Sequence, residues 1–543
     1  MKAGMTIILR KFALSYQASV KQHKYFIFNI LLTSVVLFPP CLLSAQGGLF
    51  TDDATARAVF YSGNMHEAVK HFDELLRIDS MNYEYNLLCG YAYLHSNVDK
   101  SRAVVRLERA LKNPRADQLL YYDLGKAYML NYRFDDAIEA FKTAAAKGVK
   151  LQKTDITPAR YIEMCENAKV MMSIGAEVTI ENVGTAVNSP YPDYNAFINA
   201  DENILYFSSK QQGNSGSQPD FDGYKMADVY CAERVNGQWQ PAKKLQAPVN
   251  SGLQEDIVSA TSDGETLLLY FNNEKGFDDI FVTHKERKQF TRPEILSLTV
   301  NSPQREEAAA LSPDGNWIFF SSDRPSGFGG LDIYFSRRLP NGEWSNAKNA
   351  GPSVNTEYDD SYPYLAPDGT TFYFSSQGHN SMGGFDLFRS TWNPEEQFFA
   401  IPENLSFPIN TPDDNKTISV TKSGRYAYIA DFRAGSSGDL DIYKVTFKDV
   451  PAPYCPVKGI IADIDSATVM SELSKYHVII REAGTKKQVG IYRPNVHDGS
   501  FTFILQPGFY LVDFYIDNKL KSTAELVIED REPDRQVRTV KLR

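Results

Sequence analysis

The sequence predicts a multidomain protein of mixed class: a helical-repeat array, an all-β propeller of five blades and a C-terminal immunoglobulin-like β-sandwich. Three observations lead to this prediction. A unit of about 54 residues recurs five times between Val187 and Phe447, a helical pattern with a shorter period precedes it, and alternating apolar residues resume after a proline-rich linker. Short strands repeated at this period are typical of propeller blades.

The 543-residue chain is long enough for several domains, each with its own core. The boundaries follow from the changes of pattern. We expect a signal peptide at 1–45, the helical array at 51–175, the propeller at 176–448, a linker at 449–456 and the sandwich at 457–543.

The first 45 residues carry five basic residues and no acid, and an apolar stretch runs from Tyr25 to Phe38 before Ala45. This pattern predicts a secretory signal peptide cleaved after Ala45. Lipidation at Cys41 is the alternative, although the two prolines before it depart from a lipobox. No other run is long enough to span a bilayer, so we expect an exported, periplasmic mature chain with no transmembrane segment.

Removal of that segment changes the net charge from −10 to −15, because it takes away five basic residues. An acidic chain without a basic patch is a poor ligand for nucleic acid or anionic lipid. The four remaining cysteines lie far apart without a CxxC pair, which favours isolated buried thiols over disulfides or a zinc site: Cys89, Cys165, Cys231 and Cys455.

Small and large apolar residues recur through 51–175 at spacings of 35 and 34 residues. The repeated sets are Ala68, Phe72 and Leu75; Ala103, Leu107 and Ala110; Ala137, Phe141 and Ala144. The pattern looks like tetratricopeptide repeats, whose paired helices present a concave groove to a partner segment. A helical spacer without a partner is the alternative. Thr157 and Pro158 predict the start of a capping helix that reaches about Ser173.

Each propeller unit has a tight turn, an aromatic strand, a loop and a third strand that opens with aspartate. The turns fall at Asp201-Glu202, Asp263-Gly264, Asp314-Gly315, Asp368-Gly369 and Ser423-Gly424. The strand-opening aspartates are Asp228, Asp279, Asp332, Asp386 and Asp441. Glycine adopts positive φ without steric cost, so these pairs suit two-residue hairpins.

The number of blades follows from the ends of the repeat. The last copy has no fourth strand, whereas an extra strand around Val178 precedes the first copy. We therefore expect this strand to pair with the final sheet near Tyr443 and to close a ring of five blades. Six blades are the alternative and would need a degenerate copy.

After the linker, strands are predicted at 457–461, 476–480, 499–505 and 509–514, with a turn at Pro507-Gly508. This part resembles the carboxypeptidase regulatory-like domain, a resemblance of fold without peptidase chemistry.

One candidate site repeats with the blades. Eight residues before each turn stand an acid or an amide, which the register places where the innermost strand begins, beside the central channel: Asp193, Glu255, Glu306, Asp360 and Asn415. Further acids flank them at Asp256, Glu307, Asp359 and Asp414. Such a ring could hold Ca²⁺ or receive a basic side chain from a partner. The alternative is that each residue accepts backbone N–H bonds at a blade junction.

The sequence contains no GxSxG, HExxH or Walker motif and no GxGxxG after a strand, so we predict neither an enzyme nor a cofactor. Pro313-Asp314-Gly315 and Pro367-Asp368-Gly369 look like the Pro-Asp propeller repeat of TolB-like proteins. The order of domains resembles PorE-like periplasmic proteins of the type IX secretion system of Bacteroidota. In that family an OmpA-like C-terminal domain binds peptidoglycan; this sequence stops after the sandwich, so only indirect peptidoglycan contact is expected.

The resemblance implies a non-catalytic scaffold associated with the outer membrane, which holds other envelope or secretion proteins through the helical groove and the propeller face. The alternative is an exported module that binds glycan or peptide at the propeller face.

Overall fold

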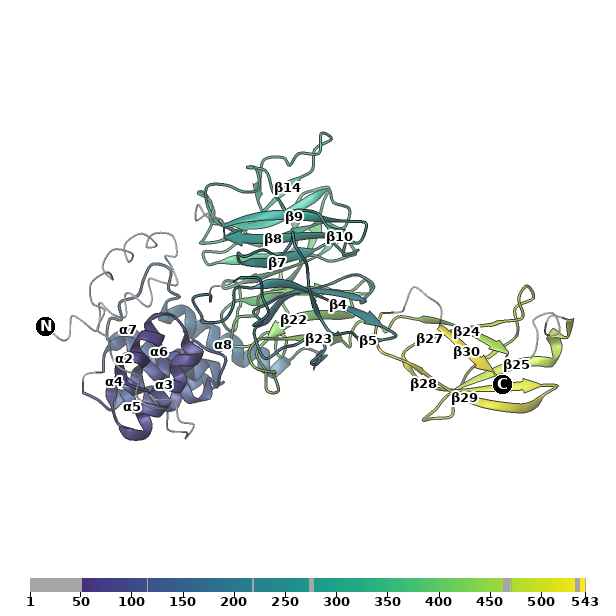
Figure 1. Ribbon diagram of the computed structural model, residues 1–543, viewed down its shortest axis with the longest axis horizontal. Helices are drawn as coiled ribbons and strands as arrows, with labels where there is room; N and C mark the ends of the chain where they lie inside the picture. Colours follow the sequence, from purple (N-terminus) through teal and green to yellow (C-terminus); the bar gives the residue numbers. More distant parts are fainter. Residues whose placement is uncertain are drawn as a thin grey trace, which may run out of the picture.

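The computed structural model describes residues 51–114, 116–216, 219–272, 278–461, 469, 471–532 and 538–542. The predicted signal peptide and Cys41 lie outside the described residues. Helices, a propeller-like set of sheets and a pair of C-terminal sheets follow one another along an elongated molecule (Figure 1).

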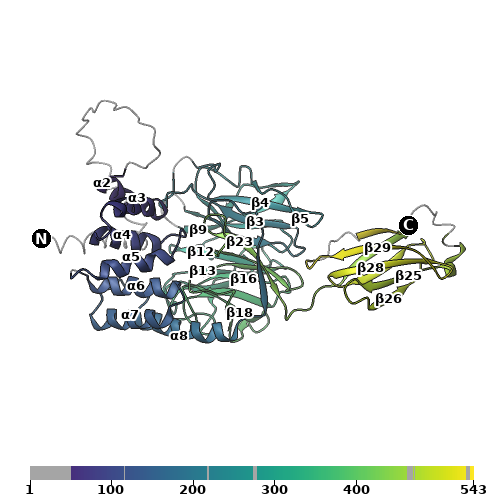
Figure 2. The same ribbon diagram turned by 90° about the horizontal axis from the view of Figure 1, so that it is seen from below.

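The helical region stacks as antiparallel neighbours beside the propeller (Figure 2). Its helices among the described residues are α2 (Asp53–Tyr61), α3 (Met65–Ile78), α4 (Tyr83–Leu94), α5 (Ser101–Leu111), α6 (Gln118–Leu130), α7 (Phe134–Ala146) and α8 (Pro158–Ile174). The predicted N-cap of α8 is confirmed, since the Thr157 side chain accepts the Arg160 N–H. Close helix contact requires glycine at Gly90 and Gly125, where an added Cβ would lie within 2.6 Å of Leu107 and 2.7 Å of Phe141.

Five antiparallel sheets follow between residues 178 and 447. Their strand orders are β2-β3-β4-β5 with β6 beside β4, β10-β9-β8-β7 with β11 beside β9, β12-β13-β14-β15, β16-β17-β18-β19 with β20 beside β18, and β1-β23-β22-β21.

The strands of these sheets are β1 (Val178–Asn182), β2 (Asp193–Ile198), β3 (Ile204–Ser209), β4 (Asp228–Val235), β5 (Gln238–Trp239), β6 (Lys243–Lys244), β7 (Glu255–Ala260), β8 (Thr266–Asn272), β9 (Asp278–Glu286), β10 (Gln289–Phe290), β11 (Glu294–Ile295), β12 (Glu306–Leu311), β13 (Trp317–Ser322), β14 (Asp332–Arg337), β15 (Lys348–Asn349), β16 (Asp360–Leu365), β17 (Thr371–Ser376), β18 (Asp386–Asn393), β19 (Phe398–Phe399), β20 (Glu403–Asn404), β21 (Ile418–Val420), β22 (Tyr426–Asp431) and β23 (Asp441–Phe447).

The predicted closing contact is confirmed. Strand β1 pairs antiparallel with β23, with Val178 opposite Phe447 and Asn182 opposite Tyr443. The ring is also joined across the first and last sheets, because the Ser419 hydroxyl donates to the Ala196 carbonyl at 2.9 Å. An early segment therefore completes the sheet that the end of the repeat leaves open.

The turn glycines behave as the sequence predicts, with φ between 69° and 74° at four of the five turns: Gly264, Gly315, Gly369 and Gly424. The first turn instead has Glu202 at a φ of 55°. A side chain rarely adopts this conformation without additional support, and the contacts of Glu202, described below, supply it.

The C-terminal region forms two sheets, β27-β24-β30 and β26-β25-β28-β29. Their elements are β24 (Cys455–Ile461), η1 (Leu473–Lys475), β25 (Tyr476–Glu482), β26 (Gln488–Tyr492), β27 (Phe501–Leu505), β28 (Gly508–Ile516), β29 (Lys519–Ile528) and β30 (Arg538–Leu542). Val457, Val478 and Phe501 are fully buried in one core cluster with residues of both sheets. The region therefore has its own core, as a separate domain requires.

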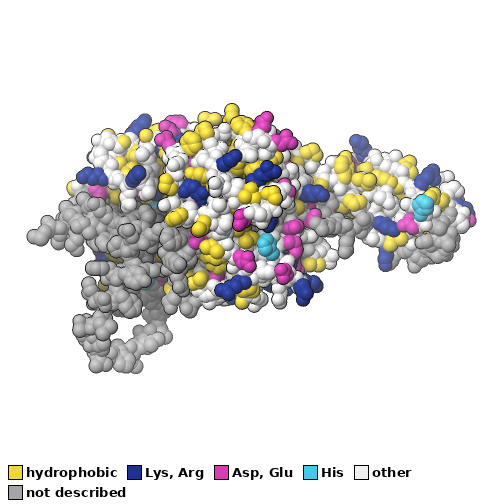
Figure 3. Space-filling model, turned by 90° about the horizontal axis from the view of Figure 1, so that it is seen from above, with side chains coloured by type: hydrophobic (Ala, Val, Ile, Leu, Met, Phe, Trp, Pro, Cys, Tyr) yellow, Lys and Arg dark blue, Asp and Glu magenta, His cyan; other side chains and the backbone are white. Residues whose placement is uncertain are grey.

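None of the described helices is long and apolar enough to cross a membrane. Acidic, basic and apolar side chains are interspersed over the propeller on the face seen in Figure 3.

Candidate functional site

The five residues of the predicted ring occupy equivalent places at or just before the start of the innermost strands. Four are fully buried, and Asn415 is 2% exposed. Each acts as an acceptor for the connection that leads into its strand. Four of them accept a backbone N–H from the residue four positions earlier: Asp193 from Ser189 at 2.6 Å, Glu306 from Ser302 at 2.8 Å, Asp360 from Thr356 at 2.5 Å and Asn415 from Thr411 at 2.7 Å. The fifth, Glu255, accepts the hydroxyl of Ser251.

These are the contacts of the capping alternative. Burial raises the pKa of Asp193 to about 6, that of Glu255 to about 7 and that of Asp360 to about 8. No group of three or more His, Cys, Asp or Glu side chains that could hold a metal ion occurs in the described part of the chain. Cation binding by the ring stays a hypothesis.

The residues next to the ring line a cavity of about 750 Å³ at this end of the propeller. They are Tyr194, Asp256, Glu307, Tyr362, Asp414 and Lys416. Successive residues of a strand point to opposite sides, so a shift of one position moves Tyr194, Asp256 and Glu307 from the blade junction to the cavity. Tyr362 stands two positions after Asp360, where the backbone has a positive φ of 50°. Of the predicted flanking acids, Asp256, Glu307 and Asp414 line the cavity. Asp359 does not, and accepts the Leu331 N–H at 2.8 Å instead.

The helical array supplies the other wall of the cavity. The end of α2 contributes Phe60 and Tyr61, and α3 contributes Met65 and His66. The C-terminal part of α4 and the residues after it contribute a further group: Tyr91, Leu94, His95, Ser96, Asn97 and Lys100. The end of α2, the start of α3, and the end of α4 with the connection to α5 thus lie against the chain's own propeller.

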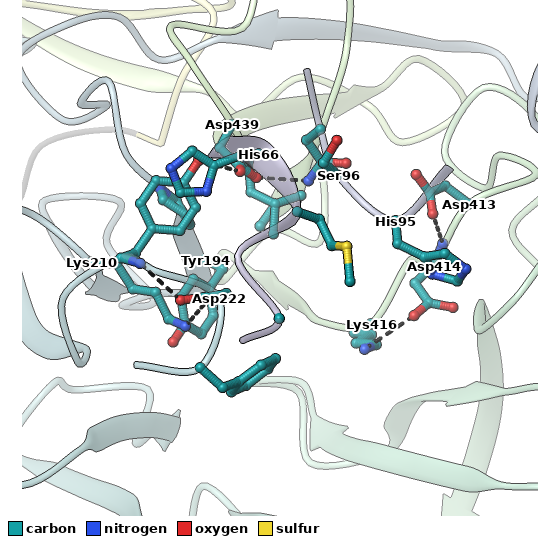
Figure 4. Close-up of a pocket in the computed structure, with 18 of the residues that line it drawn as sticks. His66, His95, Ser96, Tyr194, Lys210, Asp222, Asp413, Asp414, Lys416 and Asp439 are labelled. Atoms are coloured by element: carbon teal, nitrogen blue, oxygen red, sulfur yellow. Dashed lines mark hydrogen bonds and ion pairs between the residues drawn. The ribbon is translucent and has the colours of Figure 1, made fainter. Parts of the chain in front are cut away.

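Three lysines at the cavity pair with carboxylates. Lys100 pairs with Asp413, Lys416 lies 3.1 Å from Asp414, and Lys210 contacts both Asp220 and Asp222. Figure 4 shows Lys210 and Asp222 on one side of the cavity and the Lys416–Asp414 pair on the other. Because the nearby carboxylate of Asp414 favours the charged form, the pKa of Lys416 is raised above its usual range.

Two other carboxylates of the cavity receive neutral donors. The Tyr194 hydroxyl donates to Asp256 at 2.6 Å, and the Gln254 amide donates to it at 2.9 Å. Asp439 accepts the Asn97 amide at 2.7 Å. The Tyr224 hydroxyl donates to Asp439 at 3.1 Å, and the Tyr224 ring stacks on His66 with centroids 4.3 Å apart. The Asn97 and His66 contacts join the array to the propeller across the cavity.

Farther along the array, Arg160 fixes α8 to the propeller. Its guanidinium is almost fully buried and donates to the carbonyls of Gln377 and Gly378 at 2.8 and 2.7 Å. The Asn167 amide donates to the Ser381 carbonyl at 3.0 Å, and Met382 is packed in the core of the last helices. The array therefore contacts the propeller from α3 to α8.

The opposite end of the innermost strand β2 carries a second buried join. Glu202 pairs with Arg234 at 2.9 Å and with Lys444 at 2.7 Å. Its carboxylate also accepts the Tyr428 hydroxyl at 2.9 Å and the backbone N–H of Glu532 at 2.8 Å. The residues after β29 are thus bound to the propeller.

No protein-family model matches this chain, and no curated protein matches it. Among solved structures it is similar to TolB from Acinetobacter baumannii, with 15% identity, a TM-score of 0.30 and 48% of this chain covered; the alignment spans 56% of the TolB chain. It is also similar to the periplasmic gluconolactonase PpgL of Pseudomonas aeruginosa, with 11% identity, a TM-score of 0.27, and 62% of this chain and 88% of that chain covered.

A third similar structure is the α-L-arabinanase of Penicillium chrysogenum complexed with arabinobiose, with 12% identity, a TM-score of 0.31, and 50% of this chain and 99% of that chain covered. These likenesses to propeller proteins are distant and concern the fold alone.

Proposed function

We propose that this chain is a non-catalytic periplasmic scaffold, associated with the outer membrane through other proteins and related to the PorE-like components of type IX secretion. In this proposal the helical pairs are tetratricopeptide repeats, the five sheets form a TolB-type propeller, and the C-terminal sheets form a carboxypeptidase regulatory-like domain. The order of the three parts along the chain supports it.

The observation that carries the proposal is the pair of buried joins at the propeller. Arg160 fixes the array through main-chain carbonyls, and Glu202 fixes the residues after β29 through a main-chain N–H. A scaffold has to hold its binding surfaces at fixed separations, and buried charged contacts restrict movement between domains more than exposed ones do.

Partners would bind surfaces that these joins leave free. Each of the three parts exposes large apolar side chains: Ile78 in the array is 86% exposed, Phe328 in a propeller loop 52% and Phe509 in the C-terminal sheets 69%. Apolar side chains that remain exposed in a folded protein are frequent at protein interfaces, where they are buried on binding.

Site-specific photocrosslinking in the native cell envelope tests the proposal. A photoreactive residue is placed at Ile78, Phe328 or Phe509, and at the exposed Glu395, in the turn between β18 and β19, as a control. We expect protein adducts with envelope components at two or more of the three sites and none at the control, identified by mass spectrometry. Absence of protein adducts at all three sites would overturn the scaffold role.

The cavity favours a second candidate, an exported module that binds a glycan or peptide. Its volume of about 750 Å³ lies within the range of about 300–1,000 Å³ that is common for ligand sites. A glycan-array signal from the purified chain, combined with failure of the crosslinking experiment, would favour this candidate over the scaffold.

A further inference from the structure

The cavity between the array and the propeller carries more negative than positive groups. Its lining includes seven carboxylates but only three lysines: Asp222, Asp256, Glu307, Asp413, Asp414, Asp431 and Asp439, with Lys100, Lys210 and Lys416. Each lysine is already engaged by at least one carboxylate. Two further carboxylates lie beside arginines that do not line the cavity: Asp431 is 2.6 Å from Arg433, and Glu307 is 3.6 Å from Arg305. A negative excess remains after these pairs have formed.

Asp256 and Asp439 account for part of this excess. Both are 8% exposed, and the described residues give neither of them an ion-pair partner. Their donors are the neutral Tyr194, Gln254, Asn97 and Tyr224. A buried carboxylate without a cation is costly, because its lost hydration is only partly replaced by hydrogen bonds. A positive group that entered the cavity and reached either carboxylate would be stabilised by it.

Aromatic rings make up much of the remaining wall, which suits a cation carried on an organic skeleton. The rings belong to Phe60, Tyr61, Tyr91, Tyr194, Phe221, Tyr224, Tyr270 and Tyr362. Ammonium and guanidinium groups bind favourably over such rings within about 6 Å. The cavity already holds one example, since the Lys210 ammonium lies 5.8 Å from the centre of the Phe221 ring.

Two of these rings are also exposed at the surface. Tyr61 is 40% exposed and Phe221 is 53% exposed, although both line the cavity. They come from opposite walls, Tyr61 from the end of α2 and Phe221 from the loop before β4. The Phe221 loop meets the α2–α3 turn at Gly63, where an added Cβ would lie 2.8 Å from the Phe221 carbonyl oxygen, so both rings lie where the array and the propeller meet.

We propose that this cavity binds an organic cation through an ammonium or guanidinium group that is held between Asp256 and Asp439 and packed against the tyrosine rings. Two sources share this chemistry: a free amine, such as a polyamine, and a lysine or arginine side chain of a peptide. The proposal does not depend on the scaffold role, because the surfaces at Ile78, Phe328 and Phe509 do not line the cavity.

Calorimetric titration of the full mature chain with spermidine and, separately, with trilysine amide tests the proposal. We expect saturable binding of at least one probe with a stoichiometry of one, weakened by added salt because the attraction is between charges. Asp256→Asn and Asp439→Asn should each weaken binding about tenfold or more, since asparagine keeps the acceptor oxygen but not the charge. Glu395→Gln, which replaces an exposed carboxylate, should bind as the wild type does.

Tyr61→Ala provides a variant that does not disturb the buried carboxylates, and it should weaken binding about threefold or more while the melting temperature stays near that of the wild type. Binding of the peptide alone would assign the cavity to a peptide side chain, and binding of spermidine alone to a free amine. Failure of both probes to bind, or equal affinities in wild type, Asp256→Asn and Tyr61→Ala, would overturn the proposal. Crosslinking at Ile78 or Phe509 would be unaffected by that outcome.

Discussion

Glu202 and Glu532 are joined by a hydrogen bond of 2.8 Å from the Glu532 N–H to the Glu202 carboxylate, although 330 positions separate them in the sequence. Glu202 is 1% exposed and also pairs with Arg234 and Lys444. The first turn of the propeller therefore holds the segment that follows β29 through a buried charge. These three contacts and the hydrogen bond from the Tyr428 hydroxyl support the positive φ of Glu202, which is unusual for glutamate.

Glu202→Gln should destabilise the protein by about 3–5 kcal/mol, because it leaves two buried cations without their carboxylate. Urea unfolding followed by tryptophan fluorescence would measure the change. Glu265→Gln is a matched control at the turn of the next blade, where the carboxylate is 53% exposed and lies 3.5 Å from Lys285. Its effect should stay within about 1 kcal/mol. Equal unfolding midpoints for the two variants would contradict the role assigned to Glu202.

Arg160→Lys should loosen the array from the propeller. The planar guanidinium reaches two neighbouring carbonyls, those of Gln377 and Gly378, whereas an ammonium cannot reproduce this fork. We expect a loss of about 1–3 kcal/mol for the carbonyls left without donors. Hydrogen–deuterium exchange should rise in α8 and in the loop at 377–381. Arg77→Lys, at a side chain that is 75% exposed, should leave exchange in both segments unchanged; a rise there would show that the effect is not specific.

The strands, the turns and the ring closure could be predicted because they follow from local patterns. Alternating apolar residues, turn glycines and the missing last strand each indicate where a segment pairs, and the contact of Val178 with Phe447 confirms that reasoning. The helical pattern likewise placed the N-cap at Thr157. The turns and the blade strands recur with a period, so several copies support each of those assignments.

The cavity could not be predicted in the same way, because its two walls belong to different repeats. No periodic signal links Asn97 to Asp439 or Arg160 to Gly378, and these contacts depend on how two finished domains fit together. The five ring residues stand at or just before the starts of the innermost strands, but the pleat places Glu306 at the junction and Glu307 at the cavity. The first turn has Glu202 where the other four turns have glycine. This difference in the sequence is the signal of the buried contact between Glu202 and Glu532.

Asp360→Asn should make stability less dependent on pH. Burial raises the pKa of Asp360 from 3.8 to about 8, so the folded state holds this proton more tightly than the unfolded state does. The protonated Asp360 side chain therefore contributes fully to the stability of the folded protein at acid pH, and this contribution is lost as pH rises from about 4 to about 8. Asparagine needs no proton, and Asn415 already makes the equivalent contact to the Thr411 N–H.

Melting temperatures of wild type and Asp360→Asn, measured at pH 5 and at pH 8, would check this. The melting temperature of Asp360→Asn relative to that of the wild type should be higher at pH 8 than at pH 5. Glu395→Gln, at an exposed carboxylate, should show no such gain. A difference between Asp360→Asn and wild type that is the same at both pH values would show that Asp360 does not take up a proton in the folded protein.

Gly383→Ala should weaken the boundary between the fourth and fifth sheets. An added Cβ would lie 2.5 Å from the Thr411 carbonyl oxygen and 2.6 Å from the Pro412 carbonyl carbon, both main-chain atoms that cannot rotate away. We expect a loss of about 1–3 kcal/mol in urea unfolding, as for other overpacked sites. Gly213→Ala is the matched control, because a Cβ there meets nothing within 4 Å.

Gly438→Ala tests the closure of the ring, because an added Cβ there would also clash with main-chain atoms that lead into the next sheet. Gly438 stands three positions before Asp441, as Gly383 does before Asp386, and its Cβ would lie 2.3 Å from the Pro190 carbonyl oxygen. Pro190 precedes the first sheet, so this contact spans the boundary between the last and the first blade. If that boundary is as tightly packed as the internal one, Gly438→Ala should cost as much as Gly383→Ala. A cost near that of Gly213→Ala would instead show that the ring opens at its closing boundary in solution, because only there could the new methyl group be accommodated by a small separation of the sheets.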